Sequence, residues 1–297
     1  MIKLSLRQLE VFVAIAAREH VTQAADALAL SQSATSMALA ELEANLGLKL
    51  FDRQGKQLRL NADGARLLPE AIALLERAQA WLASARAPET PVIELRLAAS
   101  LTIGNYLLPG LIADFRQRHP QARIELALLN SREVAEAVRH FRADLGFIEG
   151  FPDTRGLAVE PWREDELAVF CGLDADLPSG EALAPERLLA QPWVLREAGS
   201  GTRQVFERAL GERVHALRLA LELTQTEAII QAVKAGLGLG CLPVLALADA
   251  LAAGQVRRLS CPALGLGRRL SLLRHPDKYA NPGLRLFLDY CQARAGA

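Results

Sequence analysis

The chain has 297 residues, and because roughly 100 to 200 residues per domain is usual, two or three domains are expected. Hydrophobic residues make up 51% and charged residues 23%, which is a globular composition and excludes a disordered or fibrous chain. The 34 basic and 34 acidic residues cancel, so any surface that binds nucleic acid must be a local one.

Targeting and metal-binding patterns are missing from the sequence. The start, MIKLSLRQLE, lacks the apolar core of a signal peptide, and no stretch reaches the roughly 18 apolar residues that span a bilayer. The cysteines are far apart and form no CxxC pair, which argues against a zinc site or a disulfide framework. They are Cys171, Cys241, Cys261 and Cys291. We expect a soluble, cytoplasmic protein with no membrane partner, no metal site and no cofactor.

The first part of the chain has the pattern of three helices and a wing. Apolar residues recur at helical spacing over residues 6–16, 22–28 and 31–46. Residues 51–61 then alternate charged and apolar side chains, as a short two-stranded wing does. Residues 1–61 are therefore predicted to form a winged helix-turn-helix DNA-binding domain.

A long linker helix is predicted over residues 62–87, with an apolar stripe that includes Leu75 and Leu82. Such a stripe packs either against the wing or against a second copy, and we favour dimerisation because its own domain offers little to cover it. Pro69 inside a helix costs about 3 kcal/mol and usually kinks it. Residues 88–91 contain two prolines and are predicted to be a hinge.

The rest of the chain, residues 92–297, alternates strand-like and helical runs. This rhythm predicts a parallel sheet with helices on both faces, and it starts again near Trp193. We expect two lobes that face a cleft, lobe I at about 92–163 and 267–297 and lobe II at about 164–266. The fold class is therefore α+β and multi-domain.

With these elements placed along the chain, the sequence resembles the LysR-type transcriptional regulators. Residues 6–68, from LRQLEVF to GARLL, resemble the DNA-binding signature of that family, and EAGSGTRQVFE and TQTEAIIQAVKAGLGLGCLP resemble its effector-binding domain. The segments ASLTIGNYLLPGLIADFRQRHP and VRHFRADLGFIEG are most similar to the branch associated with sulfur assimilation and carbon fixation. The resemblance implies a two-lobed C-terminal fold similar to periplasmic binding proteins, a small-molecule coinducer between the lobes, homodimers that assemble into homotetramers, and RNA polymerase as a further partner.

The third predicted helix is the candidate recognition helix, because the second helix of a helix-turn-helix enters the major groove with its N-terminal residues at the base edges. Gln32 can bond to an adenine edge and Met37 can touch a thymine methyl group. Since Glu41 and Glu43 follow, phosphate attraction must come from elsewhere. The candidates are Arg7, Lys49, Arg53, Lys56 and Arg59, of which Lys56 at the wing tip and Arg53 at its base are best placed. The predicted DNA-contacting residues are Ser31, Gln32, Ser33, Thr35, Ser36, Met37, Arg53 and Lys56. The alternative is that these polar residues only cap and solvate the helices.

Hydroxyl and amide side chains stand at several strand-to-helix junctions of the C-terminal domain. Ligands of two-lobed α/β units sit outside the carboxyl ends of strands, near helix N-termini that favour anions. The candidate effector residues are Ser100, Thr102, Ile103, Asn130, Ser131, Glu149, Ser200, Thr202 and Thr226. The resemblance also places Ser100, Thr102 and Thr202 at effector-lining positions. They suit a small oxyanion such as sulfite or sulfate, or a short organic acid; alternatively, the hydroxyls only cap helices.

Glu149 does not fit an anion site, because a carboxylate repels an anion at short range unless it is protonated or paired. Either Glu149 turns away to a basic partner, or the ligand also carries a cationic group.

Catalytic motifs are missing as well. GSG at residues 199–201 is not GxSxG, GLGLG at residues 236–240 is not GxGxxG, and the histidines show no paired ligand spacing. We therefore expect no catalytic residues and no enzyme, but a regulator that binds inverted-repeat, double-stranded promoter DNA and responds to a small effector. The alternative is a cytoplasmic solute-binding protein with an N-terminal interaction module.

Overall fold

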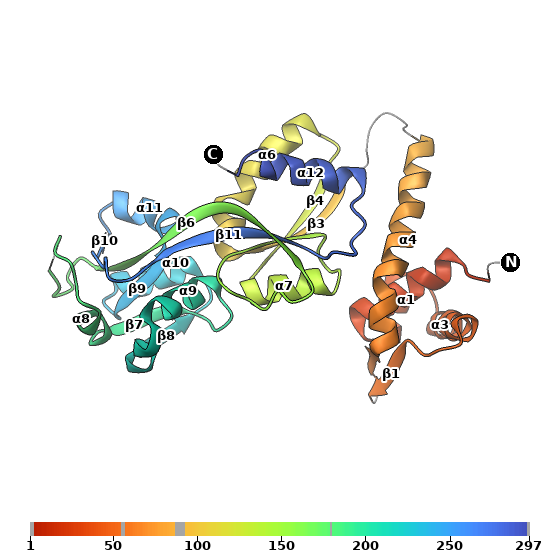
Figure 1. Cartoon of the computed structure of the whole chain (residues 1–297), viewed down its shortest axis with the longest axis horizontal. Coiled ribbons are helices and arrows are strands. Elements are labelled where there is room, and N and C mark those ends of the chain that lie inside the picture. Colours follow the sequence, from red (N-terminus) through yellow and green to blue (C-terminus); the bar gives the residue numbers. More distant parts are fainter. Residues whose placement is uncertain (1–2, 55–56, 87–92, 179, 296–297) are drawn as a thin grey trace. The chain divides into compact units, whose positions relative to one another are not determined.

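The computed structural model describes residues 3–54, 57–86, 93–178 and 180–295 (Figure 1). These residues form two compact units. The first comprises the described residues of Met1–Glu94 together with His140–Arg142 and Pro276–Leu286. The second comprises those of Leu95–Arg139, Ala143–His275 and Phe287–Ala297.

The N-terminal part of the first unit is a winged helix-turn-helix, as the sequence predicts. Its elements are α1 (Leu6–Arg18), α2 (Val21–Ala27), α3 (Gln32–Leu46), β1 (Phe51–Gln54), β2 (Gln57–Leu60) and α4 (Ala62–Arg86). The strands β1 and β2 are antiparallel, with Phe51 opposite Leu60. Phe12, Ile15 and Leu42 are buried together at the centre of this small core. The apolar positions of three helices and the wing thus account for the domain.

Local capping explains where the helices begin and end. Ser5 and Gln8 form a capping box at the start of α1, in which each side chain accepts the backbone N–H of the other residue. Gly47 ends α3 with φ of 71°, a left-handed conformation that glycine adopts without strain. The helix-turn-helix boundaries are therefore encoded within a few residues of each helix end.

The helix α4 is continuous through Pro69, although a proline inside a helix was expected to kink it. Asn61 caps it, since its Oδ1 accepts the N–H of Gly64 at 2.9 Å. The first half of α4 buries Leu68 and Ile72 in the core of the winged domain, while Leu82 further along is 50% exposed. The predicted hinge, residues 88–91, lies outside the described residues.

Strands and helices alternate from Glu94 onward. They are β3 (Glu94–Ser100), α5 (Leu101–Tyr106), α6 (Leu108–Arg118), β4 (Arg123–Leu129), α7 (Ser131–Arg139), β5 (Leu145–Ile148), β6 (Ala158–Gly172), α8 (Pro185–Leu189), β7 (Pro192–Arg196), α9 (Gly201–Leu210), the 3-10 helix η1 (Gly211–Ala216), β8 (Arg218–Leu223), α10 (Thr226–Lys234), β9 (Leu239–Pro243), α11 (Val244–Ala252), β10 (Val256–Arg258), β11 (Gly267–Arg274) and α12 (Pro282–Gln292).

The strands form a mixed sheet in the order β4-β3-β5-β11-β6-β9-β7-β8, with β10 paired to β6. The strand β3 is parallel to β5, and β7 is parallel to β8 and β9, as the βαβ rhythm predicts. The strands β6 and β11 are antiparallel to their neighbours. The predicted parallel pairing therefore holds within each half, while the sheet as a whole is mixed, because β6 and β11 carry the chain between the two halves in opposite directions.

The long strand β6 divides the sheet into two lobes. Up to Glu166 it pairs with β11, and from Leu167 onward it pairs with β9. One lobe thus contains β3, β4 and β5, and the other contains β7, β8, β9 and β10 (Figure 1). The lobe bounds near residues 163 and 267 remain a prediction.

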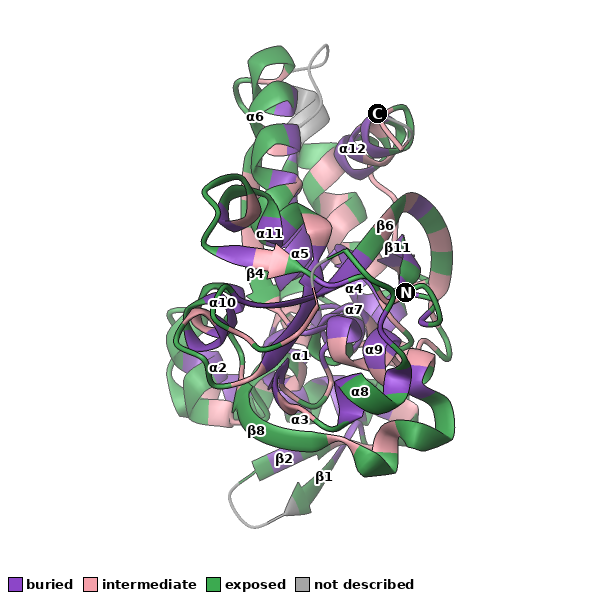
Figure 2. Ribbon diagram, turned by 90° about the vertical axis from the view of Figure 1, so that its left-hand side faces the viewer, coloured by how far each residue is buried: buried purple, intermediate pink, exposed green. Residues whose placement is uncertain are grey.

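Each lobe has its own apolar core. In the second lobe Trp193 of β7 packs against Phe206 of α9, with ring centroids 4.6 Å apart, in a core that also contains Leu239 and Cys241 of β9. The edge strand β8 is exposed along almost its whole length, as Figure 2 shows. Among the helices in the described part of the chain, none is long and apolar enough to cross a membrane.

Candidate functional site

The N-terminus of α3 is held by Ser31. Its Oγ accepts the N–H of Ala34 at 3.1 Å and lies 3.0 Å from the Oγ of Ser33. Ser31 is therefore a helix cap, which is the simpler of the two roles considered for it, although its side chain remains exposed.

Thr35 does not belong to the exposed face of α3. The residue is fully buried, and its hydroxyl donates to the carbonyl of Ser31 at 3.0 Å. Because the side chain is buried, the prediction that Thr35 contacts DNA is wrong. Thr35 lies on the same helix face as the buried Leu39 and Leu42, so it supports the helix from inside.

Four further residues of the predicted contact set are exposed on α3, namely Gln32, Ser33, Ser36 and Met37. Met37 is 61% exposed, so its apolar side chain is available on this face of α3. Arg53 on β1 is also exposed, and no carboxylate among the described residues pairs with it. Lys56 lies outside the described residues.

The acidic residues of α3 have structural partners. Glu43 is buried, and its two oxygens accept the N–H of Leu50 at 2.9 Å and the ammonium group of Lys49 at 2.7 Å. Glu41 accepts a hydrogen bond from the side chain of Gln8 at 3.2 Å. Glu43 thus fastens the wing to α3, a role that the sequence did not reveal.

A buried polar cluster lies in the second unit, and four of the predicted effector residues belong to it. Ser100, Thr102, Glu149 and Thr202 are each 1% exposed. The hydroxyl of Ser100 donates to Oε2 of Glu149, and the hydroxyl of Thr102 lies 3.4 Å from Oε1 of the same carboxylate. Ser100 precedes α5 but makes no capping bond with its side chain, so its hydroxyl serves the cluster instead.

Arg268 completes this cluster, and it is the functional residue that sequence reasoning missed. Its guanidinium donates to the hydroxyl of Thr202 at 3.0 Å and to that of Thr102 at 3.3 Å. It lies 3.7 Å from Glu149, and its Nε donates to Asp165 at 2.6 Å. Since Thr102 is on α5 and Thr202 is on α9, the side chain of Arg268 bonds to groups from both lobes. The hydroxyl cluster thus consists of Ser100, Thr102, Thr202, Glu149, Asp165 and Arg268.

The electrostatic balance of the hydroxyl cluster is negative. Its two carboxylates and one guanidinium leave one formal negative charge in a site that is almost fully buried. Buried charges persist in proteins when they are paired and hydrogen-bonded, and here the hydroxyl groups and Arg268 supply both. Glu149 therefore has a basic partner, but it does not turn away from the hydroxyl groups to reach it.

The two lobes approach each other closely beside this cluster. A Cβ atom added to Gly201 would lie 2.1 Å from the carbonyl oxygen of Glu149, so only glycine fits there. The predicted residue Ser131 borders the same contact, and its buried Oγ has no hydrogen-bond partner within the described ranges. Asn130 and Ser200 are helix caps, since their side chains accept the N–H groups of Glu133 and Arg203 respectively.

Ile103 and Thr226 complete the predicted set but do not join the cluster. Ile103 is fully buried in α5. Thr226 begins α10 and is buried as well. Neither side chain bonds to the hydroxyl cluster among the residues that the structure covers.

The cysteines are not placed for redox chemistry. Burial raises the pKa of Cys261 to about 11 and that of Cys291 to about 12, and it also raises the pKa values of Cys171 and Cys241. Because the thiolate is the reactive form, these thiols are poor nucleophiles at neutral pH. The described residues also contain no group of three or more His, Cys, Asp or Glu side chains that could hold a metal ion.

A winged helix-turn-helix, a long helix and a two-lobed α/β domain with polar groups buried between its lobes define a ligand-responsive DNA-binding regulator. Family models agree. The bacterial regulatory helix-turn-helix of the lysR family matches residues 6–65, and the LysR substrate-binding domain matches residues 88–296. The chain belongs to the LysR family of bacterial transcriptional regulators, and it is a regulator rather than an enzyme.

Two curated relatives cover almost the whole chain. The HTH-type transcriptional regulator YeiE of Escherichia coli K12 is 44% identical over 288 residues, which is 97% of each chain. The RuBisCO operon transcriptional regulator of Allochromatium vinosum is 32% identical over 98% of this chain and 96% of its own length. The second relative fits the branch that the sequence indicated.

The fold matches that of a solved full-length regulator. A full-length OxyR variant from Pseudomonas aeruginosa superposes with a TM-score of 0.75 at 20% sequence identity, covering 99% of this chain and 95% of that one. At this identity the match concerns the fold alone, and it confirms the predicted succession of an N-terminal helix-turn-helix and a C-terminal α/β domain.

Proposed function

We propose that the protein binds inverted-repeat promoter DNA as a dimer, and that a small oxyanion or short carboxylate bound at the hydroxyl cluster modulates this binding. The observation that carries the proposal is the buried set of hydroxyl groups around Arg268, which joins the two lobes of the effector-binding domain. A ligand that replaces one of these side-chain contacts changes how the two lobes are held together.

The DNA contact is assigned to the exposed N-terminal residues of α3 and to the wing. Gln32 can read an adenine edge, Met37 can touch a thymine methyl group, and the hydroxyls of Ser33 and Ser36 can bond to bases or phosphates. Part of the positive charge of this domain is neutralised, since Lys49 is paired with Glu43 and Arg7 with Glu10. Affinity must therefore come from Arg53, from Lys56 and from the binding of two half-sites at once.

Dimerisation is supported by apolar side chains that the single chain leaves exposed. On α4 these are Leu74 and Leu82, which are 44% and 50% exposed. The edge strands β4 and β8 expose Leu128 and Leu219. Unpaired edges with exposed leucines favour a second copy, because they otherwise promote aggregation. Two such surfaces allow dimers to assemble into a tetramer in the cytoplasm, where RNA polymerase is a further partner.

The effector assignment follows from what already occupies the hydroxyl cluster. The hydroxyls of Ser100 and Thr102, together with Arg268, hold one carboxylate, that of Glu149. A group that binds a carboxylate in this way also suits a short organic acid, sulfite or sulfate. Because the cluster is negative overall, such an anion binds when Glu149 moves out.

A second effector chemistry has an observation in its favour. The net negative charge of the cluster favours a ligand that carries a cationic group as well as an acidic one. Such a ligand would pair with Glu149 or Asp165 and would leave Glu149 in place. Thermal-shift measurements with sulfite, sulfate, acetate and glycine distinguish these chemistries: stabilisation by the simple anions supports the first, and stabilisation by glycine alone supports the second.

The regulator function itself is tested by a mobility-shift titration with DNA from upstream of the gene, at several salt concentrations. Salt-sensitive binding to an inverted repeat supports the proposal. If no such binding occurs while small anions still stabilise the protein, the alternative of a solute-binding protein with an N-terminal interaction module is favoured.

A further inference from the structure

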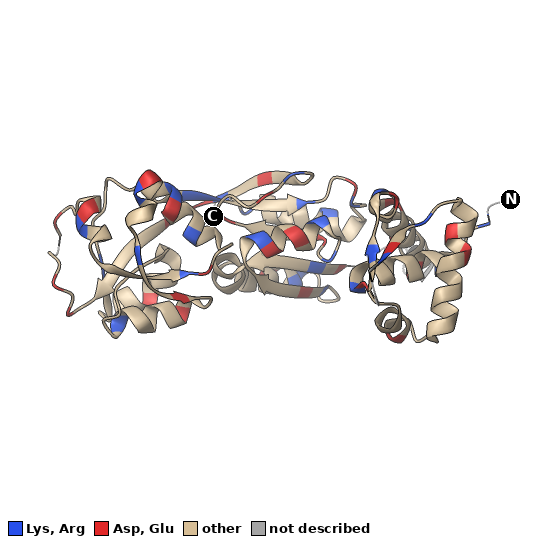
Figure 3. Ribbon diagram, turned by 90° about the horizontal axis from the view of Figure 1, so that it is seen from below, with Lys and Arg blue, Asp and Glu red and all other residues tan. Residues whose placement is uncertain are grey.

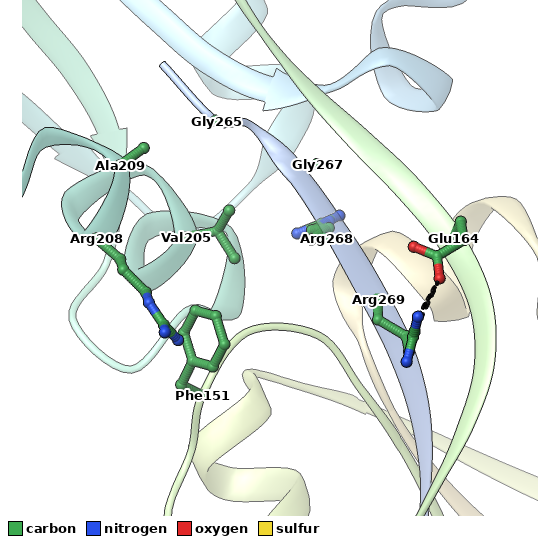
Figure 4. A pocket seen from close by; sticks show the side chains of 9 residues that line it. All are labelled: Phe151, Glu164, Val205, Arg208, Ala209, Gly265, Gly267, Arg268 and Arg269. Carbon is green, nitrogen blue, oxygen red and sulfur yellow. Dashed lines mark hydrogen bonds and ion pairs between the residues drawn. The ribbon is translucent and has the colours of Figure 1, made fainter. Parts of the chain in front are cut away.

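An open pocket of about 570 Å³ lies between α9 and β11 (Figure 4). Val205, Arg208 and Ala209 of α9 line one side, and they lie three and four positions apart on one helix face. Gly267 and Arg269 of β11 line the other side. A pocket of this volume is in the range that holds small organic ligands and exceeds what an inorganic anion fills.

The alternation of β11 separates this pocket from the hydroxyl cluster. Arg268 is buried and directs its guanidinium to Thr102 and Thr202. Successive side chains of a strand point to opposite faces, and Gly267 and Arg269 are both exposed. Although Arg268 also borders the pocket, Ser100, Thr102 and Thr202 do not line it. The pocket is therefore separate from the three hydroxyl groups of the cluster.

The pocket carries one positive charge that has no acidic partner. The guanidinium of Arg208 lies 4.2 Å from the ring centroid of Phe151, which holds it at the pocket rim. Within the described ranges no carboxylate pairs with Arg208, whereas Arg269 is paired with Glu164 at 2.8 Å. An anion at the rim would thus meet Arg208 as the available cation, and Glu164 would disfavour a second negative charge.

The remaining surface of the pocket is apolar or bare backbone. Val205 and Ala209 line the pocket where α9 packs onto the apolar core of the lobe, and the Phe151 ring lies against Arg208 at the rim (Figure 4). A Cβ atom added to Gly267 would meet no atom within 4 Å, so the strand offers an open, flat wall at this point. A flat wall opposite an aliphatic helix face suits a planar, apolar body.

We propose that this pocket is a second ligand site, which takes a monocarboxylate with an aromatic body. The carboxylate binds the guanidinium of Arg208 through charge-assisted hydrogen bonds, and the ring lies between the helix face and the wall at Gly267. This inference does not depend on the effector assigned to the hydroxyl cluster.

The test is isothermal titration calorimetry of the full-length protein with 1-naphthoate, and with benzoate and inorganic phosphate as comparison ligands. We expect one naphthoate site per chain and tighter binding of naphthoate than of benzoate, because the larger ring buries more apolar surface. Arg208→Gln should weaken naphthoate binding by about tenfold or more. Gly267→Val should weaken it similarly, because the valine side chain would occupy the open space beside β11 where the ring is proposed to lie.

Arg213→Gln is the matched control, because it removes an exposed arginine of the same lobe outside the pocket, and it should leave naphthoate binding unchanged. Circular dichroism confirms that each variant is folded. The proposal is overturned if naphthoate does not bind, if phosphate binds as tightly as naphthoate, or if the Arg208→Gln protein binds naphthoate like the parent.

Discussion

Replacing Glu149 by glutamine separates the two roles of the hydroxyl cluster, stability and anion binding. Glutamine keeps an oxygen that accepts from Ser100, and Arg268 keeps its bond to Asp165 at 2.6 Å. The attraction lost is that between Arg268 and Glu149 at 3.7 Å, about 4 kcal/mol at an effective dielectric constant of about 20. Because desolvation of the pair offsets most of this attraction, we expect Glu149→Gln to lower the free energy of unfolding by only about 1 to 2 kcal/mol.

Removing the guanidinium of Arg268 should destabilise the protein much more than Glu149→Gln does. Arg268→Met leaves the buried carboxylate of Glu149 and the partly buried carboxylate of Asp165 without their basic partner. Breaking a buried pair in this way costs about 3 to 5 kcal/mol. As a control, Glu166→Gln removes an exposed acid from the same strand as Asp165 and should change the stability by less than about 1 kcal/mol. Urea denaturation of the three variants provides the comparison.

The same substitution of Glu149 raises anion affinity. Glu149→Gln removes one of the two negative charges of the cluster while the hydroxyls and Arg268 remain, so sulfite or acetate should bind about tenfold more tightly or better, which is about 1.4 kcal/mol. Calorimetry measures this directly. Weaker anion binding by the Glu149→Gln protein, or an Arg268→Met protein as stable as the Glu166→Gln control, would show that the charges of the cluster do not act in this way.

Three further outcomes are expected. Gln32→Ala should weaken operator binding by about 1 to 3 kcal/mol in a mobility-shift titration, whereas the parent affinity in this variant would remove Gln32 from the contact surface. Leu82→Glu should shift the oligomer toward smaller species in sedimentation velocity, since it places a charge on the exposed stripe of α4; an unchanged distribution would argue against that interface. Burial raises the pKa of the Cys261 thiol from 9.0 to about 11, so the unfolded chain loses this proton at a lower pH than the folded protein does. The stability that the protonated thiol contributes is therefore fully present below about pH 9 and is lost as the pH rises toward 11. Urea midpoints at pH 8 and pH 10.5 should therefore differ less in a Cys261→Ser protein than in the parent, and an equal difference would contradict this.

Local signals in the sequence explain why the winged domain was predictable. Caps at Ser5 and Ser31, the glycine that ends α3 and the alternation of the wing each act within a few residues of one another. The burial of Thr35 could also have been inferred, because it is four residues from Leu39 on the apolar face of α3. Pro69 shows the limit of such rules, since tertiary packing of its neighbours Leu68 and Ile72 keeps α4 helical there.

The hydroxyl cluster was predictable only in part, because some of its contacts join residues that are far apart in the sequence. Ser100, Thr102 and Thr202 stand at strand and helix ends, where a sequence pattern can find them. Arg268 follows Thr202 by 66 residues and bonds to Asp165 across 103 residues of chain. This contact exists because β11 pairs with β6 in one register, with Arg268 opposite Asp165. An antiparallel pairing between distant strands leaves no local signal, and the expectation of a parallel sheet pointed away from it.

The pairing of charged residues was likewise only partly predictable from the sequence. The chain is neutral overall, and Figure 3 shows acidic and basic segments interspersed along its ribbon. Sequence alone indicated that Glu43 weakens the DNA-binding face, whereas the structure pairs it with Lys49 and the backbone of Leu50. The counts of charged residues were known, but their partners depended on the fold.

The proposed mechanism requires that α3 binds an inverted repeat and that occupancy of the hydroxyl cluster changes this binding. Footprinting of the purified protein on its upstream DNA, with and without sulfite, measures both at once. We predict two protected half-sites about one helical turn apart, roughly 10 base pairs, with protection that sulfite alters in the parent protein and not in an Arg268→Met protein that remains folded. Absence of a protected inverted repeat, or a response to sulfite that persists without Arg268, would contradict the mechanism.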